Sequence, residues 1–436
     1  MNKKVPFNRS QSRGAALLIV TIFFMLGSLI AILGVGRTAY YDVLRSRTLL
    51  ESTQAYYVTE AGVEDVVYRL RKGKTVSASG IETLSFAGST ATTTITPGFD
   101  TVAVDTQSSL HSLYRANHVV LGIGGGASFS FGLQSSTGGI SMANSSAVVG
   151  NIYSNGTVTG AGSNMVYGDV VSAGASGLVT GVHATGSAYA HSIVGATIDK
   201  DAYYQSKIGS IILGTSFPGS PDQSAKPLPI TDATISDWET AAEAGGVVSS
   251  PCPYVINTNI SLGPKKITCD VVIDKSSTNL TLTGPVWITG NLDTKSGPNI
   301  LVDSSHPGAS AIIIVDNPAD RLTSSKMTLD QSTGFVATTT GTYVLMVSGN
   351  NSSELGGPEV AISAGNKTTF GQREVIYYAP HGKLNASNSV KLRGATAYAI
   401  ALSQSASVEY QTGMMSLLFT GGPSGGYIIN SWKEVQ

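Results

Sequence analysis

A run of uncharged apolar residues near the N-terminus constrains this chain more than any other feature. The segment AALLIVTIFFMLGSLIAILGV occupies residues 15 to 35, and a helix of about 20 apolar residues spans the hydrocarbon core of a bilayer. A cleaved secretory signal has a shorter apolar region of about 7–15 residues followed by a small-residue exit, a pattern that this segment lacks. The segment therefore predicts a membrane-spanning helix.

The flanks of this span and the composition of the body set the expected orientation. Residues 1–14 are basic and contain no acid, and basic residues favour the cytoplasmic side of a membrane. Arginines also follow the span closely, so the composition of the body carries more weight: it is rich in Ser and Thr and holds a cysteine pair, which suits an oxidising compartment. We expect a single-pass protein of the cytoplasmic membrane, N-terminus inside and body outside, in a pilus or on the cell surface.

The helical pattern continues well beyond the span. Residues 36–72 contain no proline, and Gly62 is the one glycine in the amphipathic second half. Apolar residues recur there at helical spacing. They are Tyr56, Val63, Val66, Val67 and Leu70. We predict one helix from about residue 15 to 72, roughly 87 Å long at ~1.5 Å per residue, with an apolar inner half and an amphipathic outer half.

A short basic leader ending in Gly14, followed by such a helix, resembles the N-terminus of type IV pilins and pseudopilins. The motif SRGAALLIV carries the resemblance. It implies that a prepilin peptidase cuts after Gly14, that Ala15 becomes the mature N-terminus, and that the apolar helix packs against other pilin-like subunits. Major pilins carry Glu at the fifth mature position, which is Ile19 here. This departure, together with AYYVTEAGVEDVVYRL, is similar to PilX-type minor pilins and to the tip pseudopilin of type II secretion, from Met1 to about Thr75.

The rest of the chain is predicted to be mainly β. The stretches ATTTIT, DTVAVDT and LYRANHVVL read as short strands of a small antiparallel sheet. From Gly122 to Ile198 the chain contains one charged residue, Asp169, and short apolar runs end repeatedly in Gly, Asn or Ser, as at Gly150 and Gly168. Such recurrence favours a β-helix, or β-solenoid, in which each coil buries its apolar side chains by stacking. A β-sandwich of similar strand length remains the alternative.

The segment DATISDWETAAEAGG interrupts the strand pattern and reads as a capped helix that begins at Thr231 or Asp232 and stops at Gly245. Strands resume from Cys252. The predicted units are a basic leader (1–14), a transmembrane plus amphipathic helix (15–74), a small β-sheet (75–121), a Gly/Ser-rich β-solenoid (122–205), a linker with a short helix (206–250) and a C-terminal β-solenoid (251–436).

Two cysteines, Cys252 and Cys269, lie close to one another in β-like sequence. In a stack of coils this spacing places them on adjacent coils, where a disulfide forms if the Cα atoms lie within about 7 Å. The other reading is two buried free thiols. Their spacing does not match a metal site.

The sequence offers little to support catalysis. The acids of the C-terminal half stand singly after strands, where Asp forms turns, and His183 and His191 have no acid or cysteine near them in sequence. His306 and His381 lie beside prolines, and Asp199-x-Asp201 is a weak pair. No nucleophile, phosphate-loop or calcium motif is present. We therefore expect no enzyme, no cofactor and no metal site.

Charge and anchoring narrow the expected function. Charged residues make up 13% of the chain, the net charge is −1, and acids outnumber bases after residue 74, so no binding to nucleic acid is expected. The leading hypothesis is a minor pilin or pseudopilin used for pilus assembly, at the tip or in adhesion. Its expected partners are other pilin-like subunits, a prepilin peptidase, and glycans or other components of cell surfaces. The alternatives are a membrane-tethered carbohydrate-binding or carbohydrate-active β-helix and a plain envelope surface protein.

Overall fold

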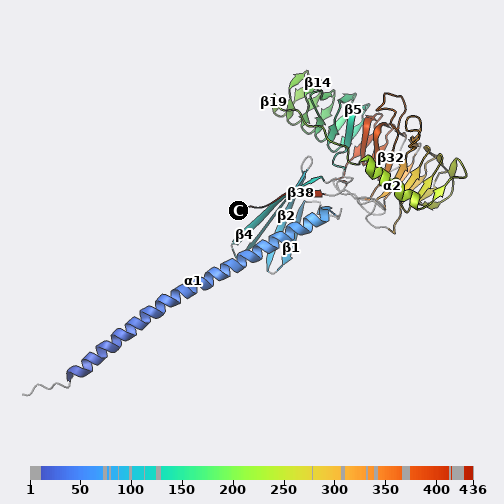
Figure 1. Ribbon diagram of the computed structural model, residues 1–436. Coiled ribbons are helices and arrows are strands. Elements are labelled where there is room, and N and C mark those ends of the chain that lie inside the picture. Colours follow the sequence, from blue (N-terminus) through green and yellow to red (C-terminus); the bar gives the residue numbers. More distant parts are fainter. Residues whose placement is uncertain are drawn as a thin grey trace, which may run out of the picture.

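The computed structural model has a long helical stalk, a small sheet packed on its outer half, and a large body of stacked strands (Figure 1). It describes residues 11–71, 76–77, 80–86, 88–97, 101–111, 113–123, 129–276, 278–305, 310–329, 332–337, 342–365, 374–411, 414 and 427–435. A mainly β chain with one long N-terminal helix is what the sequence predicts, and this part of the prediction is confirmed.

Helix α1 (Gln11–Arg71) forms the stalk. Its 61 residues extend about 90 Å at ~1.5 Å per residue. Residues 16–50 are exposed along their whole length, whereas from Ala55 onward the helix buries one face. The helix already includes Gln11, before the predicted start at about residue 15, because no proline stands between Gln11 and Gly14 to break it.

The outer half of α1 packs on a five-stranded antiparallel sheet in the order β1-β2-β3-β4-β38. Its strands are β1 (Ile81–Phe86), β2 (Ser89–Pro97), β3 (Thr101–Leu110), β4 (Leu113–Ile123) and β38 (Tyr427–Val435). Val63, Val66 and Val67 of α1 are buried against Val104 and Leu121 of the sheet. The predicted apolar stripe is therefore the face that holds the helix to the sheet.

Gly62 lies where α1 approaches the sheet closely. A Cβ at this position would lie 2.9 Å from Ala91 Cβ and 3.0 Å from Thr106 Cγ2, so the lack of a side chain permits the contact. Next to it, Ser108 Oγ donates to the carbonyl of Ala55 at 2.7 Å. The glycine that weakens the helix in isolation is thus a packing residue in the folded chain.

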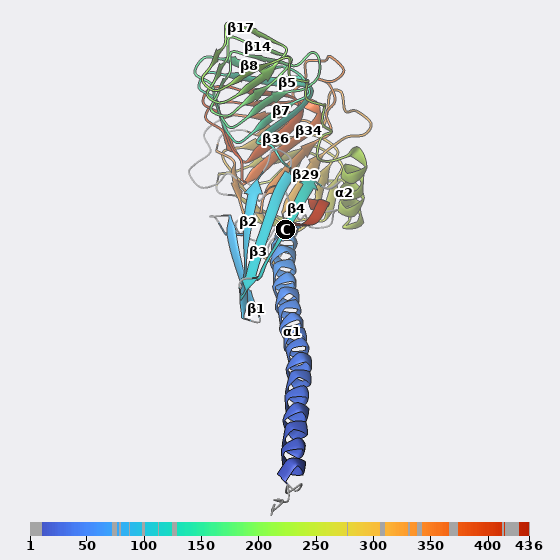
Figure 2. The same ribbon diagram turned by 90° about the vertical axis from the view of Figure 1, so that its left-hand side faces the viewer.

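Strand β38 comes from the C-terminal end of the chain and pairs antiparallel with β4, with Trp432 opposite Val119 (Figure 2). Arg115 Nη1 donates to Glu434 Oε1 at 2.7 Å across the same pair, over a sequence separation of 319. The body is consequently an insertion between two neighbouring strands of the small sheet. The predicted boundaries at 121 and 436 differ from this division, because a local pattern cannot reveal so distant a pairing.

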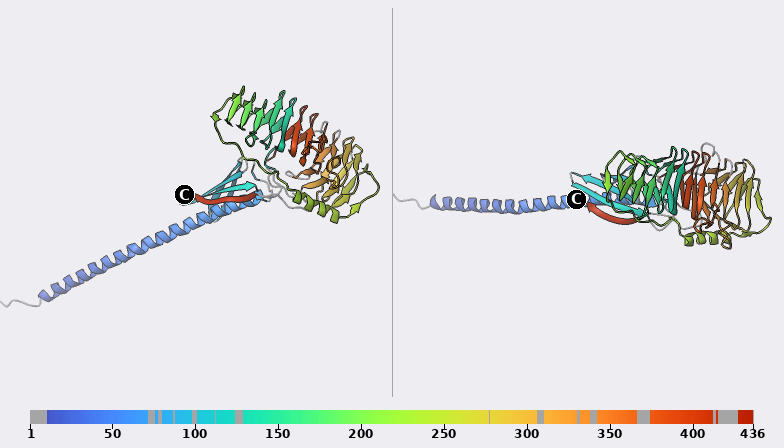
Figure 3. Two further views of the ribbon diagram at one scale, coloured as in Figure 1. Left: turned by 45° about the horizontal axis from the view of Figure 1, so that its top comes forward. Right: turned by 90° about the horizontal axis from the view of Figure 1, so that it is seen from above.

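The first half of the body winds in coils of three short strands, and each coil stacks on the previous one in parallel register (Figure 3). We name the resulting columns ladders 1, 2 and 3. Strand β5 (Leu133–Ala143) contributes its first part to ladder 1 and its last part to ladder 2. Ladder 1 continues with β7 (Ile152–Ser154), β10 (Val170–Ser172), β13 (Ala188–Tyr189), β16 (Ala202–Tyr204) and β19 (Ser216–Pro218). Ladder 2 continues with β8 (Val158–Ala161), β11 (Leu178–Thr180), β14 (Ser192–Val194) and β17 (Ser206–Ile208). Ladder 3 contains β6 (Ala147–Val149), β9 (Met165–Tyr167), β12 (His183–Ala184), β15 (Thr197–Ile198) and β18 (Ile211–Ile212).

The coils of this half become shorter toward β19. In ladder 1, Leu133 pairs with Ile152, and Ile152 pairs with Val170. Further along, Ala188 pairs with Ala202, so the later coil uses fewer residues for one turn. All five side chains are buried in one core. They shrink from Leu, Ile and Val to Ala as the coil narrows.

The last short coil lies in a segment that the sequence assigns to a linker. Residues 206–218 form β17, β18 and β19 instead. Strand β17 pairs in parallel with β14, and the hydroxyl groups of Ser192 and Ser206 lie 2.6 Å apart across this pair. The parallel stack of the first half therefore extends beyond residue 205.

The second half of the body repeats this design. Its coils are longest where Leu292 pairs with Met327 and are much shorter where Ile376 pairs with Gly394. In this half, ladder 1 contains β20 (Val247–Val248), β23 (Lys265–Ile267), β26 (Val286–Ile288), β29 (Ala311–Val315), β32 (Val344–Ser348), β34 (Val375–Ala386) and β36 (Gly394–Leu402). Ladder 2 contains β21 (Tyr254–Ile256), β24 (Val271–Asp274), β27 (Leu292–Lys295), β30 (Met327–Leu329), β33 (Ile362–Ala364) and the ends of β34 and β36. The third side contains β22 (Ile260–Leu262), β25 (Asn279–Leu282), β28 (Asn299–Val302), β31 (Gly334–Val336), β35 (Lys391–Leu392) and β37 (Ser407–Glu409).

The last coil of the body stacks on the first. Ala395 pairs with Leu133 and Ser407 with Ala147, both in parallel register, so the two halves form one continuous stack. The coils on the two sides of this junction have similar lengths. Both ends of the stack therefore come from the middle of the chain, and the chain enters and leaves the body at mid-stack. This parallel pairing differs from the antiparallel pairing of a β-sandwich.

Helix α2 (Asp232–Ala244) lies across the outer face of ladder 1 in the second half (Figure 1). Thr231 caps its N-terminus by accepting from the amide of Thr234, and Gly245 follows its last residue, as the sequence predicts. Ile235, Trp238 and Ala242 face the strands. The helix packs closest to β23 and β26. Together with Ile230 and Leu228 of the segment before it, the helix shares one apolar cluster with an apolar strip on the strands, which consists of Trp287, Ile312, Ile314, Leu345, Val347, Ile376 and Tyr378.

Candidate functional site

The most unusual surface of the described chain is the bare half of α1. The side chains from Ala16 to Leu50 are exposed, and large apolar ones such as Phe24, Met25 and Leu33 expose 80%, 72% and 64% of their area. Soluble monomers rarely expose an apolar surface of this extent. The helix is long and apolar enough to cross a membrane, so this surface needs a bilayer or neighbouring helices to cover it.

Charge along this bare surface is confined to its outer end. Arg37 is the first charged residue after the span and lies 5.7 Å from the ring centroid of Tyr41. The span itself contains no acid, and Ile19, which stands where major pilins have Glu, exposes 53% of its area. The absence of a charge leaves the span free to insert at no electrostatic cost.

Gly14 and Ala15 lie inside α1, within its first turns. The proposed processing site is therefore helical in backbone, and cleavage after Gly14 would leave a helix that starts at its first residue. The basic residues of the leader other than Arg13 lie outside the described residues.

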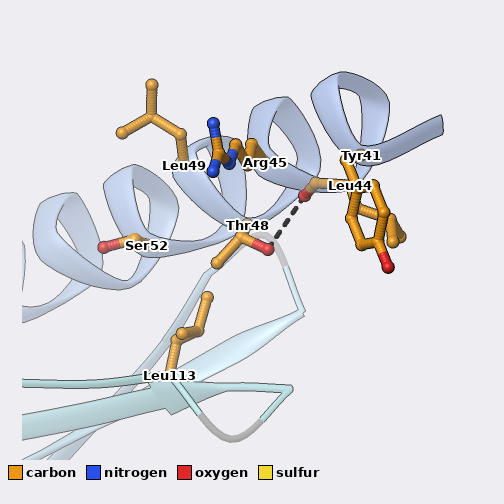
Figure 4. Close-up of a pocket in the computed structure, with 7 residues that line it drawn as sticks. All are labelled: Tyr41, Leu44, Arg45, Thr48, Leu49, Ser52 and Leu113. Carbon is orange, nitrogen blue, oxygen red and sulfur yellow. Dashed lines mark hydrogen bonds between the residues drawn. The ribbon is translucent and has the colours of Figure 1, made fainter. Parts of the chain in front are cut away.

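A shallow pocket of about 390 Å³ lies where α1 meets the turn between β3 and β4 (Figure 4). Thr48 Oγ1 donates to the carbonyl of Leu44 at 2.9 Å on its wall. The pocket is lined by Tyr41, Leu44, Arg45, Thr48, Leu49, Ser52 and Leu113. With one arginine, three hydroxyls and no acid, it can receive an apolar side chain but holds no acid–base pair.

Cys252 and Cys269 form a disulfide whose Cα atoms are 5.9 Å apart. The bond lies just before β21 and β24, which pair in parallel with Tyr254 opposite Val271. It therefore ties two adjacent coils together near the β20 end of the stack. Both sulfur atoms are used in this bond, so neither cysteine is a thiol nucleophile.

The histidines differ from the sequence-based expectation, because the fold brings an acid to each: Asp199 from the next coil and Asp222 from the segment after β19. His183 Nε2 lies 3.1 Å from Asp199 Oδ1, and His191 Nδ1 lies 3.1 Å from Asp222 Oδ1. The statement that neither has an acidic companion is wrong in space, although it holds along the sequence. Each site is a partly exposed ion pair, and His306 lies outside the described residues.

Single Asn and Asp side chains at the corners of the coils accept hydrogen bonds from backbone amides of the next coil. Asn151 Oδ1 accepts from the amide of Asp169 at 2.9 Å, and Asp169 Oδ1 accepts from the amide of Ser187 at 2.7 Å. Asp201 Oδ1 accepts from the amide of Thr215 at 2.8 Å in the same column. Asp169, the one charged residue between Gly122 and Ile198, is thus structural, as is Asp201, the second acid of the D-x-D pair.

A buried carboxyl pair beneath α2 was missed by sequence reasoning. Glu239 exposes 7% and Asp316 1% of their areas. Arg321 donates to both oxygens of Asp316 at 2.8 and 2.6 Å. Burial, followed by the hydrogen bond and the charge of Asp316, raises the pKa of Glu239 to about 8. The sequence does contain a sign of this buried pair, because Glu239 is an acid one turn after Ile235 on the apolar face of the predicted helix.

His381 lies close to α2 and contacts two acids. Its Nδ1 is 2.5 Å from Glu354 Oε2, and its Nε2 is 3.2 Å from Asp232 Oδ1. Burial lowers the pKa of His381, but Asp232 and Glu354 together outweigh burial and raise it. Among the residues that the structure describes, no three His, Cys, Asp or Glu side chains are placed to hold a metal ion.

Comparisons with known proteins add a distant likeness. No family model matches the chain, and no curated protein matches it. Among solved structures, it is similar to the competence-associated pilin ComZ from Thermus thermophilus, with 11% identity and a TM-score of 0.27, over 88% of this chain and 97% of that chain. A TM-score this low supports no argument about function, so the proposals below rest on the geometry and on the N-terminal motif.

Proposed function

We propose that this chain is a minor type IV pilin-like subunit that displays a β-solenoid module outside the cytoplasmic membrane. The observation that carries the proposal is the division of α1: residues 16–50 are exposed and largely apolar, while Val63, Val66 and Val67 hold the outer half to an antiparallel sheet. A helix of this design can exchange lipid for neighbouring apolar helices without disturbing its own head domain.

The insertion of the body supports a display role. The chain leaves the small sheet after β4 and returns to it in β38, so two connections join the body to the sheet. The stack then extends to both sides of this attachment, which presents two ends and a long outer surface. In our proposal, a prepilin peptidase cleaves after Gly14, other pilin-like subunits pack on α1, and the body contacts glycans or other cell-surface components.

The role is proposed as structural rather than catalytic. The carbohydrate-active alternative needs two facing carboxylates in an open groove, and the pair Glu239–Asp316 instead lies beneath α2 with Arg321 bound to it. The plain surface-anchor alternative predicts the same span but no processing and no filament. The experiment below separates it from the pilin-like role.

The test is immunogold labelling of the body in the native host, with and without prepilin peptidase. The pilin-like role predicts label on filaments or at discrete envelope sites that depends on the peptidase. Gly14→Val should abolish this pattern, whereas Gly27→Val, a matched change in the same helix with no atom within 4 Å of the added Cβ, should preserve it. Uniform label over the cell body in every strain would refute the proposal.

A further inference from the structure

The segment that joins the two halves of the stack ends in α2, which lies over the strands like a strap. Trp238 is fully buried, and Tyr378 Oη donates to the carbonyl of Ile230 just before the helix. If α2 separated from the strands, the part of the apolar strip that lies beneath it, around Trp287, would face solvent. Two contacts of this helix, made by Glu239 and by His381, form only while the side chain concerned is protonated.

The first contact is the carboxyl of Glu239 on the buried face of α2. Its Oε1 has no hydrogen-bond partner among the described residues, and both oxygens of the neighbouring Asp316 already accept from Arg321. Two lysines also lie near α2: Lys266 bonds to Glu243 at 3.2 Å, and Lys265 donates to the carbonyl of Gly245 at 2.7 Å. A neutral Glu239 can donate to Asp316, whereas a carboxylate would add a second buried negative charge that Arg321 must share.

The second contact lies at the N-terminus of the helix. His381 stands between Glu354 and Asp232, the first residue of α2. Only a protonated imidazole can donate from both ring nitrogens at once. Loss of the proton therefore removes one of the two hydrogen bonds and the charge attraction that holds Asp232 in place.

We propose that α2 is a proton-dependent strap, docked on ladder 1 while Glu239 and His381 carry their protons and released from it as the pH rises. Both contacts act in the same direction, although they lie at different points of the helix. Release would uncover the apolar strip on the strands without unfolding the stack, because the strands of ladder 1 pair with one another and not with α2.

The direction follows from linkage. The pKa of Glu239 is raised in the folded state to about 8, so its contribution to docking is complete below the ordinary carboxyl range and is lost as the pH rises toward 8. The pKa of His381 is also raised, so its contribution is present below about 6.5 and is lost as the pH rises through the folded value. The other charged groups packed against these two are Asp316, Arg321, Lys266, Asp232 and Glu354.

The test is hydrogen exchange of residues 232–244 in the full-length protein in detergent micelles, at about pH 6 and about pH 9, with protection referred to the unfolded chain at each pH. Wild type should lose at least about tenfold protection in this segment, the equivalent of one unit of pKa coupling. Residues 311–315, in the strand beneath, should keep theirs. This comparison requires no variant, so it remains decisive even if a substitution prevents folding.

Two variants separate the contacts. Glu239→Gln keeps a donor and cannot ionise, so between pH 6 and pH 9 it should lose less protection of the helix than wild type and keep only the part of the loss that comes from His381. His381→Gln should lower protection already at pH 6 and reduce its dependence on pH. Unchanged protection of wild type between the two pH values, or an equal loss in Glu239→Gln and wild type, would overturn the proposal.

Discussion

Asp169 allows the clearest test of how the stack is held together. The change is Asp169→Ala, with Asp169→Asn as the matched control. In the structure, Asp169 Oδ1 accepts from the amide of Ser187 on the next coil at 2.7 Å. Alanine removes this acceptor and leaves the amide without its partner, whereas asparagine keeps an oxygen at the same place. Asn151 makes the equivalent bond one coil earlier.

The magnitude follows from the charge and exposure of the bond. A hydrogen bond to a charged group contributes about 1.5–3 kcal/mol and one between neutral groups about 0.5–1.5 kcal/mol. Asp169 is half-buried, so water screens part of this interaction, and we expect Asp169→Ala to cost about 1–2 kcal/mol. Asp169→Asn should cost less than about 1 kcal/mol.

Hydrogen exchange measures this cost where it arises, because each coil of a stack contacts mainly its neighbours. At about 1.4 kcal/mol per factor of ten, Asp169→Ala should lower the protection of residues 187–194 by roughly 5- to 30-fold. Residues 344–348, in a distant coil, should be unaffected. Equal losses in the Ala and Asn variants, or no loss in either, would refute the account of the corner bonds.

Three further changes test other parts of the fold. Lys207 lies opposite Ile193, at a position of ladder 2 where the other coils carry a buried apolar side chain. A charged residue at such a position protects the open end of a sheet from pairing with another chain. Lys207→Ile should therefore promote concentration-dependent association, measured by light scattering. Gly62→Val should overpack the helix–sheet contact and cost about 1–3 kcal/mol in chemical unfolding, whereas Gly36→Val should not disturb that contact. Removal of the disulfide by Cys252→Ser with Cys269→Ser should cost up to about 3 kcal/mol in thermal unfolding, and peptide mapping of wild type should find no free thiol.

Much of the local structure could be predicted from the sequence. The caps of α2 and the apolar stripe of α1 depend on residues within a few turns of one another, so Thr231, Gly245 and Val63 indicate them directly. The helix continues to Arg71, the last residue described before the predicted end at 72. These features arise from short-range spacing, which a sequence displays.

The order of the coils could not be predicted in the same way. The pairing of Ala395 with Leu133 depends on two coils having similar perimeters, which a local pattern does not display. The pairing of β38 with β4 spans most of the chain and is hidden for the same reason. Where a residue acts through the next coil, as His183 does with Asp199, sequence distance conceals the partner.

The central claim is that α1 belongs to a processed, pilin-like subunit, and the mature N-terminus tests it most directly. The measurement is mass spectrometry of the intact protein from the sheared filament fraction and from the membrane fraction of the native host. The account predicts a mass that lacks residues 1–14, with Ala15 first, and recovery of this species with the filaments. A protein that keeps its leader in both fractions, or is absent from the filaments, would contradict it.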